Sequence, residues 1–80
     1  MKILKFEASW CGPCKSMTKL MEGMQIPIPV ERIDVDENME LAKTFGIRGV
    51  PTLVLVDGNG KEVRRITGST TKEHIESLYS

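Results

Sequence analysis

The chain has 80 residues, of which 40% are hydrophobic and 28% charged, a composition typical of one small globular domain spanning residues 1–80. Eleven basic and eleven acidic residues give a formal net charge of zero, and because no basic cluster breaks this balance we expect no nucleic-acid partner. No apolar stretch approaches the length of a membrane span, and the apolar run after Met1-Lys2 leaves no room for a signal peptide, so we expect a cytoplasmic protein without membrane contact.

The first half of the chain predicts two strands, each followed by a helix. Lys2–Glu7 is a short apolar run bounded by turn-like residues, which is typical of a strand. From Pro13 to about Gly23 the apolar residues recur at three- and four-residue steps, as in an amphipathic helix. Val30–Val35 is predicted as the second strand, and the polar residues 36–38 offer caps for a short helix that ends at Gly46.

The second half predicts a hairpin and a last helix. Thr52–Val56 is short, apolar and β-branched, which is typical of a buried strand. Asp57–Gly60 is a strong turn signal, and the more polar Glu62–Thr67 is predicted as an edge strand. Thr70–Glu73 fits a capping box that opens a helix through Tyr79. The order βαβαββα predicts an α/β fold with a four-stranded mixed sheet and helices on both faces.

Both cysteines lie in the stretch SWCGPCK, where the first predicted strand gives way to the first predicted helix. Free backbone N–H groups at a helix start favour negative charge and lower the pKa of a thiol there. Pro13 suits the first helical turn, and Gly12 allows a tight turn that leaves the first sulfur uncovered. We therefore expect an exposed Cys11 to attack a disulfide and a more buried Cys14 to resolve the mixed disulfide.

This stretch has two further points to interpret. A closed zinc site needs four ligands, and the chain offers two cysteines and a distant His74, so we expect no metal. Trp10 is either a core aromatic or part of the rim of the site, and its place next to a reactive thiol favours the rim.

The stretch Trp10–Lys15 resembles the active-site signature of the thioredoxin family. Three further segments resemble that family in the same order: Phe45–Leu53, the turn at Asp57–Lys61, and Thr67-Gly68. The resemblance implies a minimal thioredoxin-like fold. It also implies a cis Val50–Pro51 bond beside Cys11, and a substrate groove formed by Trp10, Gly12, Pro13, Val50, Pro51, Thr67 and Gly68.

The resemblance implies a protein-disulfide reductase with no cofactor, in which Cys11 and Cys14 form the redox disulfide. No flavin or nicotinamide motif is present, so the expected partners are disulfide-containing proteins and an external reductase that donates electrons to a monomer. Three alternatives stay open: a glutaredoxin-like, glutathione-dependent reductase, an oxidase or isomerase, and a non-catalytic partner-binding subunit.

The chain departs from the family at Lys5. Thioredoxins commonly carry a buried aspartate at this position, six residues before the first cysteine, and they usually have a further strand and helix before it. Lys5, Glu7 and Lys15 are therefore the candidate modulators of the thiol pKa values. Three outcomes are open for Lys5: it pairs with Glu7 on the same strand face, it stabilises the thiolate of Cys14, or it extends to solvent.

Overall fold

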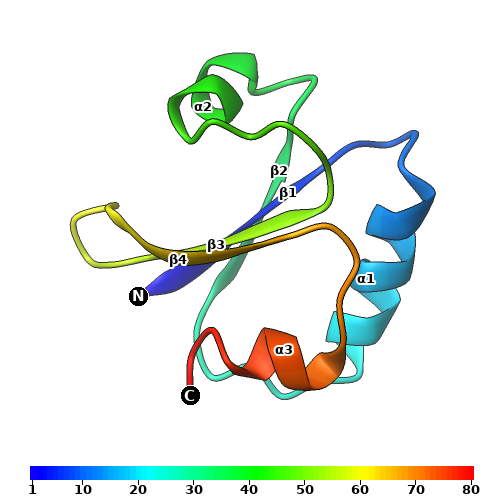
Figure 1. The fold of residues 1–80 in the computed structure, drawn as a ribbon, viewed down its shortest axis with the longest axis vertical. Coiled ribbons are helices and arrows are strands. Elements are labelled where there is room, and N and C mark those ends of the chain that lie inside the picture. Colours follow the sequence, from blue (N-terminus) through cyan, green and yellow to red (C-terminus); the bar gives the residue numbers. More distant parts are fainter.

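The computed structural model describes all 80 residues as four strands and three helices in the predicted order (Figure 1). The elements, listed along the chain, are β1 Lys2–Glu7, α1 Gly12–Glu22, β2 Val30–Asp34, α2 Met39–Thr44, β3 Thr52–Val56, β4 Glu62–Thr67 and α3 Lys72–Glu76. No helix is both long and apolar enough to cross a membrane.

The strands form one mixed sheet in the order β2-β1-β3-β4. Strand β1 pairs with β2 in parallel, and α1 makes the crossover that a parallel pair requires. Strands β1 and β3 pair antiparallel, as do β3 and β4. The fully buried β3 is therefore central, and the more polar β4 lies at an edge as predicted, where its charges discourage pairing with other chains.

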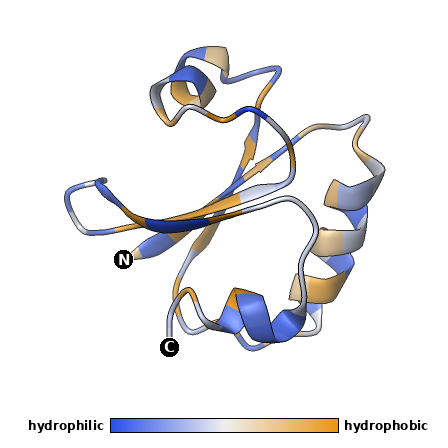
Figure 2. Cartoon of the chain, in the orientation of Figure 1, coloured by the Kyte–Doolittle hydropathy of each residue, from blue (hydrophilic) through white to orange (hydrophobic).

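Helices cover both faces of the sheet, with α1 and α3 on one side and α2 on the other (Figure 1). Alternate residues of β1 enter two separate cores, because successive side chains of a strand point to opposite faces. Ile3 packs in the core beneath α1 and α3, whereas Leu4 and Phe6 pack in the core beneath α2. Figure 2 shows hydrophilic residues on α3 and along the outer parts of α1, as expected for helices with one solvent face.

The main differences from the predicted elements lie at helix ends. Helix α1 begins at Gly12, one residue before the predicted start at Pro13, because Cys11 is its N-cap. Helix α3 is capped by Thr71, whose side chain accepts a hydrogen bond from His74 N, so the capping box predicted from Thr70 was wrong by one residue. The helix also ends at Glu76, before the predicted Tyr79.

Candidate active site

Cys11 and Cys14 form a disulfide at the start of α1, with their Cα atoms 5.3 Å apart. Cys11 is the N-cap of the helix, and its Sγ accepts a hydrogen bond from Cys14 N over 3.1 Å. An N–H at a helix start is one of the donors that the helix itself cannot satisfy. The same donor would stabilise a thiolate on Cys11 after reduction.

Both cysteines are buried, which corrects the expectation of an exposed Cys11. Cys11 is 4% exposed and Cys14 3%. They cluster with Ala8, and the half-buried Val35 and Val50 pack against this cluster. Two flanking loops therefore cover the sulfurs, which local sequence could not reveal. Gly12 stays open, since a Cβ built on it would meet no atom within 4 Å.

The loop before β3 carries the predicted cis peptide bond, between Val50 and Pro51. Val50 O lies 3.7 Å from Cys11 Sγ, so the prediction that this backbone stands beside the first cysteine is confirmed. Pro51 is buried, and its carbonyl accepts a hydrogen bond from Gly68 N over 2.8 Å. Gly68 has a φ of +86°, which suits glycine. The hydrogen bond between Gly68 and Pro51 holds the end of β4 next to the same loop.

Trp10 lies at the rim and not in the core, since 69% of the residue is exposed. Its Nε1 donates a hydrogen bond to Asp36 Oδ2 over 2.9 Å. The ring lines a hollow of about 180 Å³ together with Val35, Ile47, Arg48, Gly49 and Val50. Val50 both lines this hollow and contacts Cys11, so the hollow lies beside the first cysteine.

The hydrogen bond that Asp36 accepts from Trp10 was not predicted from the sequence, which assigned Asp36 only to the polar start of a helix. A signal was available, because Trp10 and Asp36 both follow strands that run in parallel. The carboxyl ends of neighbouring parallel strands meet at one edge of a sheet, so loops that follow them lie close together.

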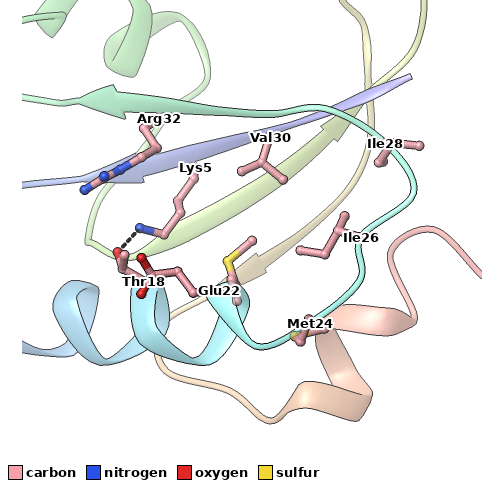
Figure 3. Close-up of a pocket in the computed structure, with 9 residues that line it drawn as sticks. Lys5, Thr18, Glu22, Met24, Ile26, Ile28, Val30 and Arg32 are labelled. Carbon is pink, nitrogen blue, oxygen red and sulfur yellow. Dashed lines mark hydrogen bonds between the residues drawn. The ribbon is translucent and has the colours of Figure 1, made fainter.

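Lys5 is buried, with 2% of the residue exposed, and it forms an ion pair with Glu7. The pairing with Glu7 is thus confirmed, and the alternative in which Lys5 extends to solvent is wrong. The reason is tertiary: α1 packs over this face of β1, and Lys5 Nζ donates to Thr18 Oγ1 on that helix over 2.6 Å (Figure 3). A buried cation needs such a partner and such a hydrogen-bond acceptor.

Arg32 completes the set, because its Nη2 lies 2.8 Å from Glu7 Oε2. Burial by itself raises the pKa of Glu7, but the hydrogen bonds and charges of Arg32 and Lys5 together outweigh it, so the pKa of this carboxyl lies below its ordinary value. Glu7 is therefore ionised at neutral pH.

Two cavities adjoin these residues. One, of about 370 Å³, lies between α1 and β2 with Lys5 and Arg32 at one end and apolar side chains such as Met24 along the rest (Figure 3). The other, of about 260 Å³, reaches Cys14 and is also lined by Glu7 and the exposed Lys15. No group of three or more histidine, cysteine, aspartate or glutamate side chains is placed to hold a metal ion. The lone His74 bonds to Thr70.

The family model described as Thioredoxin matches residues 1–80. The chain is 35% identical to the thioredoxin of Chlamydia pneumoniae, over 98% of this chain and 78% of that protein. It is 36% identical to part of the bifunctional thioredoxin reductase/thioredoxin of Mycobacterium leprae, over 88% of this chain and 16% of that protein. Among solved structures, a mutant thioredoxin from Halobacterium salinarum NRC-1 superposes with a TM-score of 0.85 at 39% identity, over 96% of this chain and 69% of that one.

Proposed function

Because this chain belongs to the thioredoxin family and is a thiol–disulfide oxidoreductase, we propose that it reduces protein disulfides with Cys11 as the attacking thiol and Cys14 as the resolving thiol. The observation that carries this assignment is the Cys11–Cys14 disulfide at the start of α1. The two thiols differ in their position on the helix. Only the Cys11 sulfur receives the Cys14 N–H and lies beside the Val50 carbonyl, where a substrate would be held.

The reaction has two exchange steps. The thiolate of Cys11 attacks one sulfur of a substrate disulfide, so a Cys11–substrate bond forms and the other substrate sulfur leaves as a thiolate that takes up a proton. Cys14 then loses its proton and attacks the Cys11 sulfur, which releases the second substrate sulfur. Two electrons have passed to the substrate, and the enzyme is left with the Cys11–Cys14 disulfide.

Substrate binding is proposed along the surface between Trp10 and Gly68. The Val50 backbone lies next to Cys11 and is suited to pair with an extended segment of a disulfide-containing protein. Trp10, Gly12 and Pro13 are exposed on the cysteine side of this groove, and Thr67 and Gly68 flank it from the end of β4. Pro51 supports the groove from within, through its carbonyl contact to Gly68.

A separate donor must restore the dithiol, because the chain has no nucleotide-binding motif of its own. We propose a thioredoxin reductase as that donor. The Mycobacterium leprae relative supports this, since its name joins both activities. We further propose that the chain works as a monomer, because one copy already carries both thiols and the groove. We also propose that it works in the reducing cytoplasm, where cysteines are kept as thiols.

Single-cysteine variants test these roles. With a disulfide-containing protein as substrate, Cys14→Ser should accumulate a mixed disulfide through Cys11, whereas Cys11→Ser should accumulate none. Trapping through Cys14 alone would reverse the assignment. Full activity of the Cys11→Ser, Cys14→Ser double variant in a binding assay would favour the partner-binding alternative. Efficient turnover with glutathione as sole donor would favour the glutaredoxin-like one.

The reduction potential separates reductase from oxidase. Equilibration of the Cys11–Cys14 pair in thiol–disulfide buffers should give a value near or below about −230 mV for a reductant. A value between roughly −180 and −120 mV would make the protein an oxidant or isomerase.

A further inference from the structure

Three charged residues near Cys14 have no part in the exchange steps above. We name Lys5, Glu7 and Arg32 the charge cluster. In it, the carboxylate of Glu7 contacts both cations. Lys5 contacts Glu7 Oε1, and Arg32 lies 2.8 Å from Oε2. The side chain of Lys5 is 3% exposed and that of Glu7 15%, so water screens their charges poorly. The charge cluster carries a net charge of +1: Lys5 and Glu7 form its largely buried pair, and Arg32, whose side chain is 64% exposed, joins them from the surface.

The charge cluster is connected to Cys14 in two ways. Lys5 Nζ donates to Thr18 Oγ1 over 2.6 Å, and Thr18 Oγ1 donates in turn to Cys14 O over 3.0 Å. Figure 3 shows the Lys5 side chain reaching from β1 to Thr18 on α1. Glu7 and Arg32 also line the cavity of about 260 Å³ that reaches Cys14. Lys5 is thus linked to Cys14 by hydrogen bonds through Thr18 on α1, whereas Glu7 and Arg32 line the same cavity as Cys14.

Two more charged groups face this cavity, Lys15 from α1 and Asp34 from the end of β2. Together with the charge cluster they make three cations and two carboxylates around Cys14. The net charge of this environment is again +1. A thiolate that forms on the buried Cys14 is therefore surrounded by a positive excess, which favours the ionised form.

We propose that the charge cluster stabilises the thiolate of Cys14 and thereby sets the reduction potential of the Cys11–Cys14 pair. This rests on the proposed function, in which Cys14 ionises in order to resolve the mixed disulfide. A charge that stabilises the thiolate stabilises only the reduced protein, because the disulfide carries no charge, and a stabilised reduced form makes the pair a weaker reductant. Lys5 and Arg32 are positioning residues in this proposal and do not touch substrate.

The sign of each charge provides the test. Arg32→Gln and Lys5→Met each remove a cation, so both should raise the pKa of the Cys14 thiol, read from its alkylation rate in a Cys11→Ser background. Asp34→Asn removes an anion and should lower it, while its amide oxygen can still accept the bonds that Asp36 N and Glu37 N now make to Asp34 Oδ1. The equilibrium constant with glutathione should shift by roughly three- to tenfold at alkaline pH, in opposite directions for the two kinds of variant.

Lys2→Gln is the matched control, because Lys2 lies on the same strand and pairs with Glu31 on β2, but its ion pair is exposed. Lys2→Gln should leave both the pKa of the Cys14 thiol and the equilibrium constant with glutathione unchanged. Arg32 has a side chain that is 64% exposed, so its removal should not affect folding even if Lys5→Met does. Shifts of the same sign in Arg32→Gln and Asp34→Asn, or shifts no larger than that of Lys2→Gln, would overturn the proposal. A wild-type protein with no reversible disulfide would instead overturn the proposed function.

Discussion

Lys5 and Arg32 lie opposite each other on the neighbouring strands β1 and β2, and both contact the carboxylate of Glu7. Strand pairing alone would leave two cations side by side, an unfavourable arrangement, with one of them buried. Glu7, two residues beyond Lys5 on the same face, removes this conflict by placing one oxygen on each cation. The buried lysine is therefore a paired residue, and its removal or that of its partner should have measurable consequences.

Glu7 should stabilise the fold in a pH-dependent way. Burial raises its pKa, but the contacts with Arg32 and Lys5 outweigh this and leave the folded pKa below the ordinary glutamate value of 4.5. Its stabilisation is thus present above that value and is lost as the pH falls through the folded pKa. Glu7→Gln should cost about 3 kcal/mol in urea unfolding at pH 7, because Lys5 stays buried without a counter-ion.

The difference in unfolding free energy between wild type and Glu7→Gln should shrink steadily at acid pH. Glu31→Gln serves as control, since its exposed pair with Lys2 should contribute less than about 1 kcal/mol at any pH. A difference for Glu7→Gln that stays constant down to about pH 3 would contradict the ionic origin of the effect.

Ile75→Ala should destabilise the whole domain by about 2–5 kcal/mol. Helix α3 has five residues, too few to be stable alone, and the fully buried Ile75 anchors it in the core beneath α1 and α3. Urea unfolding followed by circular dichroism measures the loss. Val63→Ala removes a side chain from a residue that is 41% exposed and should change stability by less than about 0.5 kcal/mol. Equal effects of the two changes would mean that α3 contributes little to stability.

Gly68→Ala should cost about 1–2 kcal/mol, because a side chain at a φ of +86° is strained even where space is available. A Cβ at Gly68 would meet no atom within 4 Å, so the cost should come from the backbone and not from a clash. Gly58→Ala is the control, with the same free space and no positive φ. Thermal unfolding of both variants separates the effect of backbone strain from that of steric crowding. A Gly68→Ala variant as stable as wild type would show that the loop relaxes.

Asp36→Ala should raise the KM for a protein disulfide by roughly fivefold while kcat changes little, as expected for the loss of one hydrogen bond worth about 1 kcal/mol. The reason is that Asp36 holds the exposed Trp10 ring at the rim through its Nε1. Glu37→Ala removes the same charge from the next residue, whose side chain makes no hydrogen bond to Trp10, and should leave KM unchanged. If both variants raise KM equally, the effect is one of surface charge and not of Trp10 orientation.

The elements of this fold and the place of its chemistry follow from patterns within the chain. Apolar runs bounded by turn residues located the strands, and helical spacing or capping residues located the helices, because burial and turn chemistry both restrict which residues occur at each place. The C-x-x-C spacing at a strand-to-helix junction located the disulfide. The resemblance of Phe45–Leu53 to a family segment predicted the cis bond at Val50–Pro51.

The surroundings of the two sulfurs, by contrast, depend on the assembled fold. Cys11 is buried because loops from distant parts of the chain bring Val35 and Val50 against it, and no local pattern carries that information. From the sequence alone, Lys5 could equally extend to solvent. In the fold, α1 packs over β1, and Thr18 on that helix accepts a hydrogen bond from Lys5. Asp36 reaches Trp10 because parallel strands end at one edge of the sheet. Local periodicity records which residues face a core, whereas contacts between side chains far apart in the chain exist only once the sheet and helices are assembled.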